Sequence, residues 1–361
     1  NPNRGNGWSG ITQWPAPDAR YAPGVVLADA NGDGYPDIIQ REGGVGWKVW
    51  LNQGNQSNLL TSIRNRYGGT ISIEYTRSTR FDNTGPDNLS DLGFNTWVVS
   101  RITRNNGLTG AQQVIETTNY SYEGGLHDYP DREFRGFNKV VETDATGNTV
   151  THYFHQDDAL KGLEYRTEVQ DAVGRLYNVA ENTYSSTPQG TGYVVRLTRT
   201  DESTFDGSAG SPVVRRTEYQ YDPYGNMTLT SYRGDPSVIG DERFAYTQHT
   251  YNTTKWIVDR PAHTYLMASD NSTVIRESWL YYDGNTIWSD PPTKGNLTLQ
   301  TNVLDTGDDP STRYEYDSYG NQILITDPLG RVTEFVYGIA DPTFTFPEKV
   351  INPLGQQIVS V

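Results

Sequence analysis

The sequence contains no cysteine among its 361 residues. This excludes a disulfide scaffold, a zinc–thiolate site and a cysteine nucleophile. It also lacks any apolar run of the roughly 18–20 residues that a membrane-spanning helix needs, and no signal peptide opens the chain. The first residue, Asn1, is not an initiator Met, and the last four, Ile358–Val361, resemble the middle of a strand. We therefore expect a piece of a longer, secreted bacterial protein whose export signal lies outside this sequence.

Positive charge is scarce. The chain has 29 Lys and Arg against 44 Asp and Glu, a formal net charge of −15. Nucleic-acid binding requires a basic face that neutralises phosphates, and anionic membranes also attract basic segments. The charge balance therefore predicts neither kind of partner. It is compatible with calcium binding and with solubility outside the cell.

Helical patterning is also missing, because no long stretch repeats apolar residues at i, i+3, i+4 and i+7. Strict alternation is common instead, as in Ile71–Tyr75, Tyr314–Tyr316 and Thr333–Tyr337. The chain is rich in Gly (36), Pro (19) and Tyr (25). Aromatic residues favour the pleated, half-buried surfaces of strands, while Gly and Pro mark turns. The sequence predicts an all-β protein of short strands joined by tight turns.

A five-residue unit recurs from about residue 130 to the end of the chain. It consists of Asp or Asn, two variable residues, Gly, and then Asn, Arg or Gln. The copies are 144–148, 171–175, 222–226, 317–321, 327–331 and 352–356. Asp accepts hydrogen bonds from nearby backbone N–H groups, Pro presets φ, and Gly supplies a positive φ. Six copies, several preceded by alternating tyrosines, indicate a true repeat of strand, turn and return strand rather than a common turn met by chance.

One short motif has the spacing of a cation site. Oxygen-bearing side chains occur at positions one, three, five and nine of the run from residue 29 to residue 37, and a backbone carbonyl would serve at position seven. The predicted calcium ligands are Asp29, Asn31, Asp33, Tyr35 (through its carbonyl) and Asp37. Strand-like residues lie on both sides, at Val25–Leu27 and Ile38–Ile39, so a helix–loop–helix site is not expected. The alternative is an Asn/Asp/Gly-rich hairpin turn that holds no ion.

Changes in sequence character suggest three regions. Residues 1–60 carry the cation motif and the strand-like run Trp47–Asn52. Residues 61–130 form a β connector with a polar loop, Asp82–Gly93, which we expect to be exposed. Residues 131–361 hold the repeats.

The repeats resemble the YD repeats of the RHS family, most closely at Tyr219–Asn226 and Tyr314–Asn321. Asp131–Phe137 resembles a signature of the B component of insecticidal toxin complexes and of SpvB-type virulence proteins. Tyr153–Gln156 and Leu160–Gly162 are similar to the same family, as is Lys294–Thr298. The cation motif resembles the FG-GAP/VCBS repeats of β-propellers. The likeness covers nearly the whole chain.

This resemblance implies an all-β fold in which the end of a β-propeller blade is followed by stacked repeats that form part of a shell. In that family the shell encloses a C-terminal toxin polypeptide, and the propeller docks on a translocation component. The resemblance therefore implies a structural, non-catalytic role with those two partners. No counterpart of the family's self-cleaving region is visible, so no protease residues are assigned.

Residue chemistry offers little for catalysis. The five histidines, at 127, 152, 155, 249 and 263, are expected to be structural or on the surface. The acidic pairs Asp157–Asp158 and Asp308–Asp309 are adjacent in the chain, so their side chains should diverge into solvent.

Two other functions stay open. One is a cell-surface adhesin or glycan- or protein-binding module, because exposed Tyr and Trp could form binding platforms. The other is an extracellular polysaccharide hydrolase, which would need two opposed carboxylates.

Overall fold

The computed structural model describes residues 24–32, 35–42, 46–52, 58–207 and 210–359. Two compact units divide the chain, one of residues 1–177 and the other of residues 178–361. In the described residues the only helical segments are two short 3₁₀ turns, Ser78–Arg80 and Gly110–Gln112. The prediction of an all-β chain is confirmed. No helix in this described part has the length and apolar character to cross a membrane.

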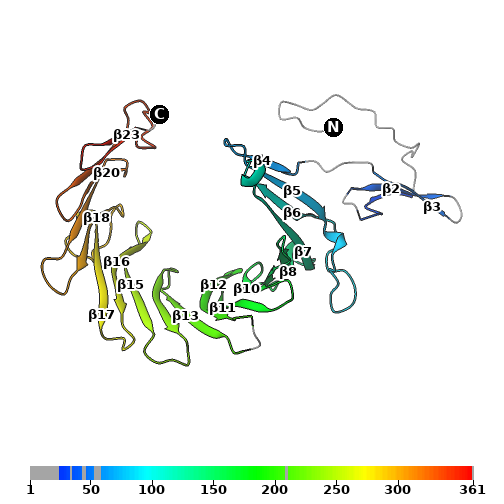
Figure 1. Cartoon of the computed structure of the whole chain (residues 1–361), viewed down its shortest axis with the longest axis horizontal. Coiled ribbons are helices and arrows are strands. Elements are labelled where there is room, and N and C mark those ends of the chain that lie inside the picture. Colours follow the sequence, from blue (N-terminus) through cyan, green and yellow to red (C-terminus); the bar gives the residue numbers. More distant parts are fainter. Residues whose placement is uncertain (1–23, 33–34, 43–45, 53–57, 208–209, 360–361) are drawn as a thin grey trace. The chain divides into compact units, whose positions relative to one another are not determined.

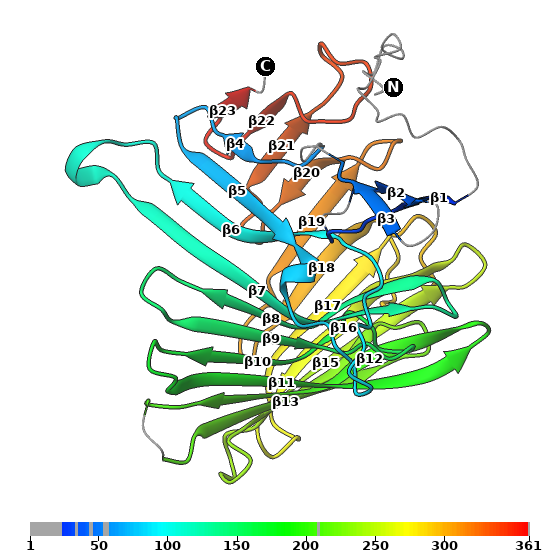
Figure 2. The same ribbon diagram turned by 90° about the vertical axis from the view of Figure 1, so that its right-hand side faces the viewer.

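The first unit contains two antiparallel sheets. A small sheet has the order β1-β2-β3, and a larger one runs in chain order from β4 to β10 (Figures 1 and 2). The strands are β1 (Val25–Ala28), β2 (Asp37–Glu42), β3 (Gly46–Trp50), β4 (Ser62–Arg64), β5 (Thr70–Arg77), β6 (Trp97–Asn105), β7 (Ile115–Asp128), β8 (Glu133–Thr143), β9 (Thr149–Phe154) and β10 (Glu164–Gln170).

The second unit is an antiparallel meander in which each strand pairs with its neighbour in the chain, coloured green to red in Figure 1. Its first strand, β11 (Leu176–Gln189), crosses the boundary between the units. The others are β12 (Gly192–Thr204), β13 (Val213–Tyr221), β14 (Met227–Gly234), β15 (Arg243–Asn252), β16 (Ile257–Met267), β17 (Val274–Tyr282), β18 (Leu297–Val303), β19 (Ser311–Tyr316), β20 (Gln322–Thr326), β21 (Val332–Val336), β22 (Lys349–Ile351) and β23 (Gln357–Val359).

All six predicted repeat copies form hairpin turns, and each has the same internal bonds. In the copy at 222–226, Gly225 N donates to Asp222 O, and Asp222 N donates to Asn226 O. The carboxylate Oδ1 of Asp222 accepts the N–H groups of Tyr224 and Asn226, both at 2.9 Å. Gly225 has φ +101°, a conformation that other residues resist. The first residue therefore holds the turn closed from within.

Two further turns follow the same plan, although the sequence pattern did not single them out as copies. Asn65 Oδ1 accepts the N–H groups of Tyr67 and Gly69 at 2.9 Å. Asp283 begins a turn whose last residues, Gly295 and Asn296, come after an insertion. Its carboxylate accepts four backbone N–H groups, from residues 293 to 296. The five-residue pattern does not reveal this copy, because the insertion separates Asp283 from Gly295 in the sequence.

Tyrosine hydroxyls tie neighbouring strands together. The hydroxyls of Tyr122, Tyr221 and Tyr282 each donate to a backbone carbonyl of the preceding strand, at 2.8–2.9 Å. Burial raises the pKa of Tyr122 and of Tyr282 to about 12, so both stay protonated donors. Tyr122 makes this bond from within β7, whereas Tyr221 and Tyr282 stand directly before Asp222 and Asp283. In those two Tyr-Asp pairs, Tyr bonds the previous strand and Asp closes the next turn.

Buried apolar residues are few. In the first unit, Leu92, Val98 and Phe137 form a core cluster against which Phe81 and Tyr122 pack. In the second unit, Val179, Phe244, Ala262 and Tyr282 are buried separately along the sheet. Sheet hydrogen bonds and cross-strand side-chain pairs therefore stabilise the strands more than a central core does.

The prediction that Asp82–Gly93 is exposed was wrong for part of the loop. Asn83 and Leu92 are only 7% and 6% exposed. Asn83 Nδ2 donates to Ser78 O at 2.9 Å, and its Oδ1 accepts the N–H of Gly125 at 2.9 Å. The polar composition misled the prediction, because the Asn amide meets backbone groups that the sheet face would otherwise leave unpaired.

Candidate functional site

The signature segment Asp131–Phe137 builds a cluster of charged side chains in the first unit. Arg135 is its centre, with a side chain that is 7% exposed. Its Nη2 lies 2.9 Å from carboxylate oxygens of Asp128 and Asp131, and 3.2 Å from one of Asp158. One guanidinium therefore gathers acidic groups from the end of β7, from the turn after it and from the loop that follows β9.

The loop after β9 is the second component of this cluster. Arg135 Nη1 donates to the carbonyl of Gln156 at 3.1 Å. The Gln156 amide in turn donates to the carbonyls of Gly124 and Gly136, at 2.8 and 2.9 Å. Lys161 contacts Glu133 and lies 3.5 Å from Asp158, and the hydrogen bond to Glu133 raises the pKa of Lys161. The segments Asp131–Phe137, Tyr153–Gln156 and Leu160–Gly162, quoted separately from the sequence, thus meet in one place.

The prediction of a solvated loop at Asp157–Asp158 is confirmed, since both side chains are more than half exposed, but each carboxylate also has a structural partner. Asp158 pairs with Arg135, as above. Asp157 Oδ1 accepts the N–H groups of Ala159 and Leu160, at 3.0 and 2.9 Å, and so caps the loop. The adjacent side chains do diverge. The partner of Asp158 lies 23 residues away in the sequence, whereas the partners of Asp157 lie on the same loop.

Aromatic rings pack beside the charged cluster. Phe94, His127 and Phe134 lie in edge-to-face contact, with Phe94 centroids 5.2 and 5.7 Å from the other two. Phe134 continues to Phe137 at 5.8 Å, and Phe137 to Tyr122 at 4.9 Å. The signature therefore alternates charged residues with rings that reach the core, which fixes the β7–β8 hairpin on both sides.

The cation motif forms a strand–loop–strand, as predicted. Its loop joins β1 to β2, and β3 pairs with β2 from Gly46 to Trp50. Asp37 is fully buried. Its Oδ2 accepts the N–H of Ala30 at 2.8 Å, and its Oδ1 that of Asn52 at 2.7 Å. This carboxylate therefore closes the loop upon itself and ties it to the end of β3.

The other predicted ligands divide into two sets. Asp29, Asn31 and Tyr35 belong to the described residues of the loop, whereas Asp33 lies outside them. Both oxygens of Asp37 accept backbone N–H groups, and each keeps a further lone pair. Among the described residues no group of three or more His, Cys, Asp or Glu side chains is placed to hold a metal ion. The ligand set named from the sequence remains a prediction.

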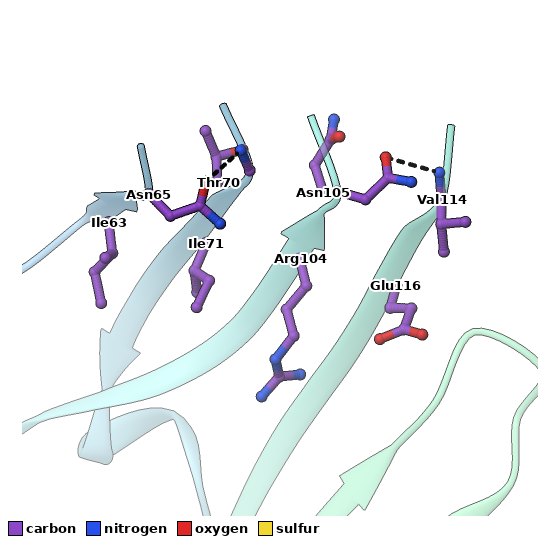
Figure 3. Close-up of a pocket in the computed structure, with 10 residues that line it drawn as sticks. Ile63, Asn65, Thr70, Ile71, Arg104, Asn105, Val114 and Glu116 are labelled. Atoms are coloured by element: carbon purple, nitrogen blue, oxygen red, sulfur yellow. Dashed lines mark hydrogen bonds between the residues drawn. The ribbon is translucent and has the colours of Figure 1, made fainter. Parts of the chain in front are cut away.

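Grooves occur at strand ends, between consecutive turns. Figure 3 shows one of about 270 Å³ in the first unit. Ile63, Ile71, Arg104 and Glu116 form a cross-strand row on β4 to β7 at this groove. Two apolar side chains are thus followed by an opposite-charge pair, an arrangement that stabilises a sheet face. It brings together no acid–base pair for chemistry.

The histidines have structural contacts. His263 lies 2.7 Å from Glu277 and stacks on Trp279 with centroids 3.6 Å apart. His152 Nδ1 lies 2.7 Å from Glu164, while His155 packs against Tyr165. Burial lowers the pKa of His249. These partners differ from one histidine to the next, so the described residues do not join the rings into a shared metal or catalytic site.

Comparison with known proteins shows which sequences and solved structures this chain resembles. Residues 15–168 match a family described as the middle/N-terminal region of the insecticide toxin TcdB. The crystal structure of TcdB2-TccC3 superposes with a TM-score of 0.61 at 15% identity, covering 93% of this chain and 26% of that one. A Tc holotoxin pore structure from Photorhabdus luminescens superposes with a TM-score of 0.59 at 14% identity, covering 92% and 25%. None of the curated proteins matches.

These likenesses establish the fold. The large antiparallel sheet is similar to that of TcdB2 over nearly the whole chain, which spans about a quarter of the length of the matched chains.

The charged cluster leads to a first prediction. Replacing Arg135 by Met leaves Asp128, Asp131 and Asp158 without their shared cation, and removing one partner of a buried pair costs about 3–5 kcal/mol. Because Asp131 and Asp158 are more than half exposed, we expect a smaller loss of unfolding free energy, about 2 kcal/mol. Chemical denaturation measures it. Arg101→Met is the control, since its pair with Glu74 is exposed and should contribute less than about 1 kcal/mol. Equal losses in the two variants would refute a special role for Arg135.

The turns lead to a second prediction. Hydrogen bonds from the Thr146 hydroxyl, then from Asn148, lower the pKa of Asp144 to about 2. A carboxyl whose pKa is lower in the folded state stabilises the fold above its unfolded value near 4 and loses that contribution as pH falls through the folded value. Asp144→Asn keeps the accepting oxygen but does not titrate. We expect the melting temperature of this variant to fall less steeply than that of the parent between about pH 4 and pH 2. Parallel curves would show that Asp144 contributes nothing to acid sensitivity.

Proposed function

We propose that this chain is a non-catalytic structural segment of a secreted bacterial protein that resembles the B component of insecticidal toxin complexes. The observation that carries the proposal is the TcdB2-like sheet, which extends over 93% of the chain. The family match over residues 15–168 supports the same assignment. The recurrent Tyr-Asp turns support the further proposal that the strands are YD/RHS repeats.

The proposed role is to form part of the wall of a shell that encloses a toxic polypeptide. The matched structures contain TcdB2 together with TccC3, and one is a holotoxin pore. By analogy, the partners of this chain would be an encapsulated C-terminal toxin polypeptide and a translocation component. The sheet suits a wall, because its hydrogen-bonded strands and closed turns give stiffness without a thick core. The contacts of the histidines and acidic pairs are also those of structural residues, which supports a role without turnover.

The test of encapsulation is an electron-microscopy map of the longer protein that contains this chain. We expect a closed β-shell around poorly ordered polypeptide, with residues 131–361 in its wall. An open strand array with no interior would refute the shell. It would favour the alternative, an adhesin or glycan- or protein-binding module, in which exposed rings such as Trp256, which is 72% exposed, contact the ligand.

We also propose that the loop from residue 29 to residue 37 binds a structural Ca²⁺ ion through Asp29, Asn31, Asp33, Asp37 and the carbonyl of Tyr35. Its supporting observations are the ligand spacing and the position of Asp37, which is buried and already bonded to the loop. The ion would offset the repulsion between the carboxylates of the loop. This small sheet would then be the end of a propeller blade.

Calcium should therefore stabilise the chain, and direct binding can be measured. We expect isothermal titration calorimetry to detect one Ca²⁺ site in the chain freed of metal by chelation, and Asp29→Asn together with Asp33→Asn to abolish it. The matched control, Asp305→Asn with Asp308→Asn, removes the same charge elsewhere and should leave binding intact. Equal loss in both pairs, or no heat in the parent chain, would contradict the site.

A further inference from the structure

One edge of the second unit gathers successive connections. Because the strands are antiparallel and follow chain order, every connection from an even- to an odd-numbered strand lies at the same edge. Four of these connections, at residues 235–242, 304–310, 327–331 and 352–356, carry exposed aliphatic side chains. Neighbouring hairpins along such an edge are about 10 Å apart, twice the strand spacing. Their side chains are therefore close enough for one extended ligand to contact several.

Large aliphatic side chains stand exposed along this edge. Ile239 is 97% exposed, Leu354 82%, Leu329 76% and Leu304 50%. Leu329, the third residue of its turn, donates its backbone N–H to Asp327 Oδ1 at 2.9 Å, a bond that does not depend on an aliphatic side chain. The polar residue Thr146 fills the same turn position in another copy. Turn geometry thus explains the acidic residues of this edge but not its apolar ones.

A groove of about 510 Å³ lies between two of these connections, 304–310 and 327–331. Its apolar wall consists of Pro310, Pro328 and Leu329, and its acidic wall includes Asp308 and Asp309. Connection 304–310 has three carboxylates and no Lys or Arg. On the opposite side, the charge of Asp327 is offset by Arg331, 2.6 Å away.

Asp309 serves the turn with one oxygen only, since its Oδ1 accepts the N–H of Leu304 at 3.0 Å. Asp308 is exposed at the tip of the connection. Arg313 is the one basic residue that lines the groove itself. The groove therefore combines an apolar strip with a negative border that the turn does not neutralise.

A second groove, of about 490 Å³, lies in the first unit and is lined by residues of the Asp144 and Asp171 turns. Val150 and Val169 contribute apolar surface to it, and Glu142 adds a third carboxylate. Its turn carboxylates are bonded within their own turns, as Asp171 is to Arg175 at 2.7 Å. The groove of the second unit differs, because Asp308 and Asp309 do not open a repeat turn.

We propose that the groove between connections 304–310 and 327–331 docks an extended, basic segment of a partner polypeptide. Aliphatic residues of that segment would pack on Pro310 and Leu329, while alternate Lys or Arg side chains would reach Asp308 and Asp309. Charge complementarity selects this partner, because the acidic border repels nucleic acid and anionic lipid. A second copy of the chain is disfavoured by its own net charge of −15. The proposal does not depend on the shell function.

The test measures binding of a fluorescein-labelled peptide of about 12 residues that alternates Lys with Val, so that it favours an extended strand. Its twin with Glu in place of Lys should not bind. In fluorescence anisotropy with the whole chain, we expect Asp308→Asn with Asp309→Asn to weaken binding about tenfold, or about 1.4 kcal/mol. Leu329→Ser should weaken it about fivefold, because it removes apolar contact and no charge.

The matched control removes two charges elsewhere, with Glu202→Gln and Asp87→Asn. It should leave the affinity within about twofold of the parent. Three results would overturn the proposal: equal weakening by the control pair, which would mean attraction by bulk charge; no effect of Leu329→Ser; or concentration-dependent self-association of the chain that the groove variants abolish, which would assign the surface to a second copy.

Discussion

A carboxylate or amide oxygen that accepts two backbone N–H groups within its own turn is the interaction on which this structure depends. Each strand of the large sheets bonds to its neighbours in the chain, so the register of each pair is set by the turn between them. In each of the six repeat turns, the side-chain oxygen of the opening Asp or Asn bonds the second and fourth residues after it, as Asp317 does with Tyr319 and Asn321. A slip of one residue would break these bonds and turn each side chain to the other face.

The turns also bond to one another along the sheet edge. The Asn226 side chain donates to Val258 O at 2.6 Å, and the Asn321 side chain donates to Phe344 O at 2.9 Å. Tyr251 donates to Asp222 Oδ2 at 2.7 Å, so one carboxylate closes its own turn and anchors the next hairpin. In a sheet with so few buried apolar residues, these links replace the stiffness that a thick core would otherwise supply.

Both units hold their strands with side-chain clusters of two kinds. In the first, a loop buries Leu92 beside Phe137, and Arg135 gathers acidic residues around the adjacent hairpin. In the second, Tyr246 and Tyr265 stack across strands with centroids 4.9 Å apart, and Arg216 pairs with Asp201 at 2.7 Å. Cross-strand ring pairs stabilise a sheet locally without a second layer. Charge clusters and ring rows are therefore alternative ways to hold strands whose faces have little apolar cover.

The sequence by itself determined the all-β character of the described residues and the six turns, because alternation and the Asp-x-x-Gly pattern act over a few residues. Local rules also predicted the strand–loop–strand around residues 29–37, though not whether it holds an ion. Only the tertiary structure decided which distant segments meet. Asp158 reaches Arg135 across 23 residues, and Asn83 reaches Gly125 across 42. A charged or amide side chain can pair with many partners, so the residue type alone does not predict which partner it has in the fold. The Asp283 turn makes the same point, since its insertion hides the pattern in the sequence while the fold brings its two ends together.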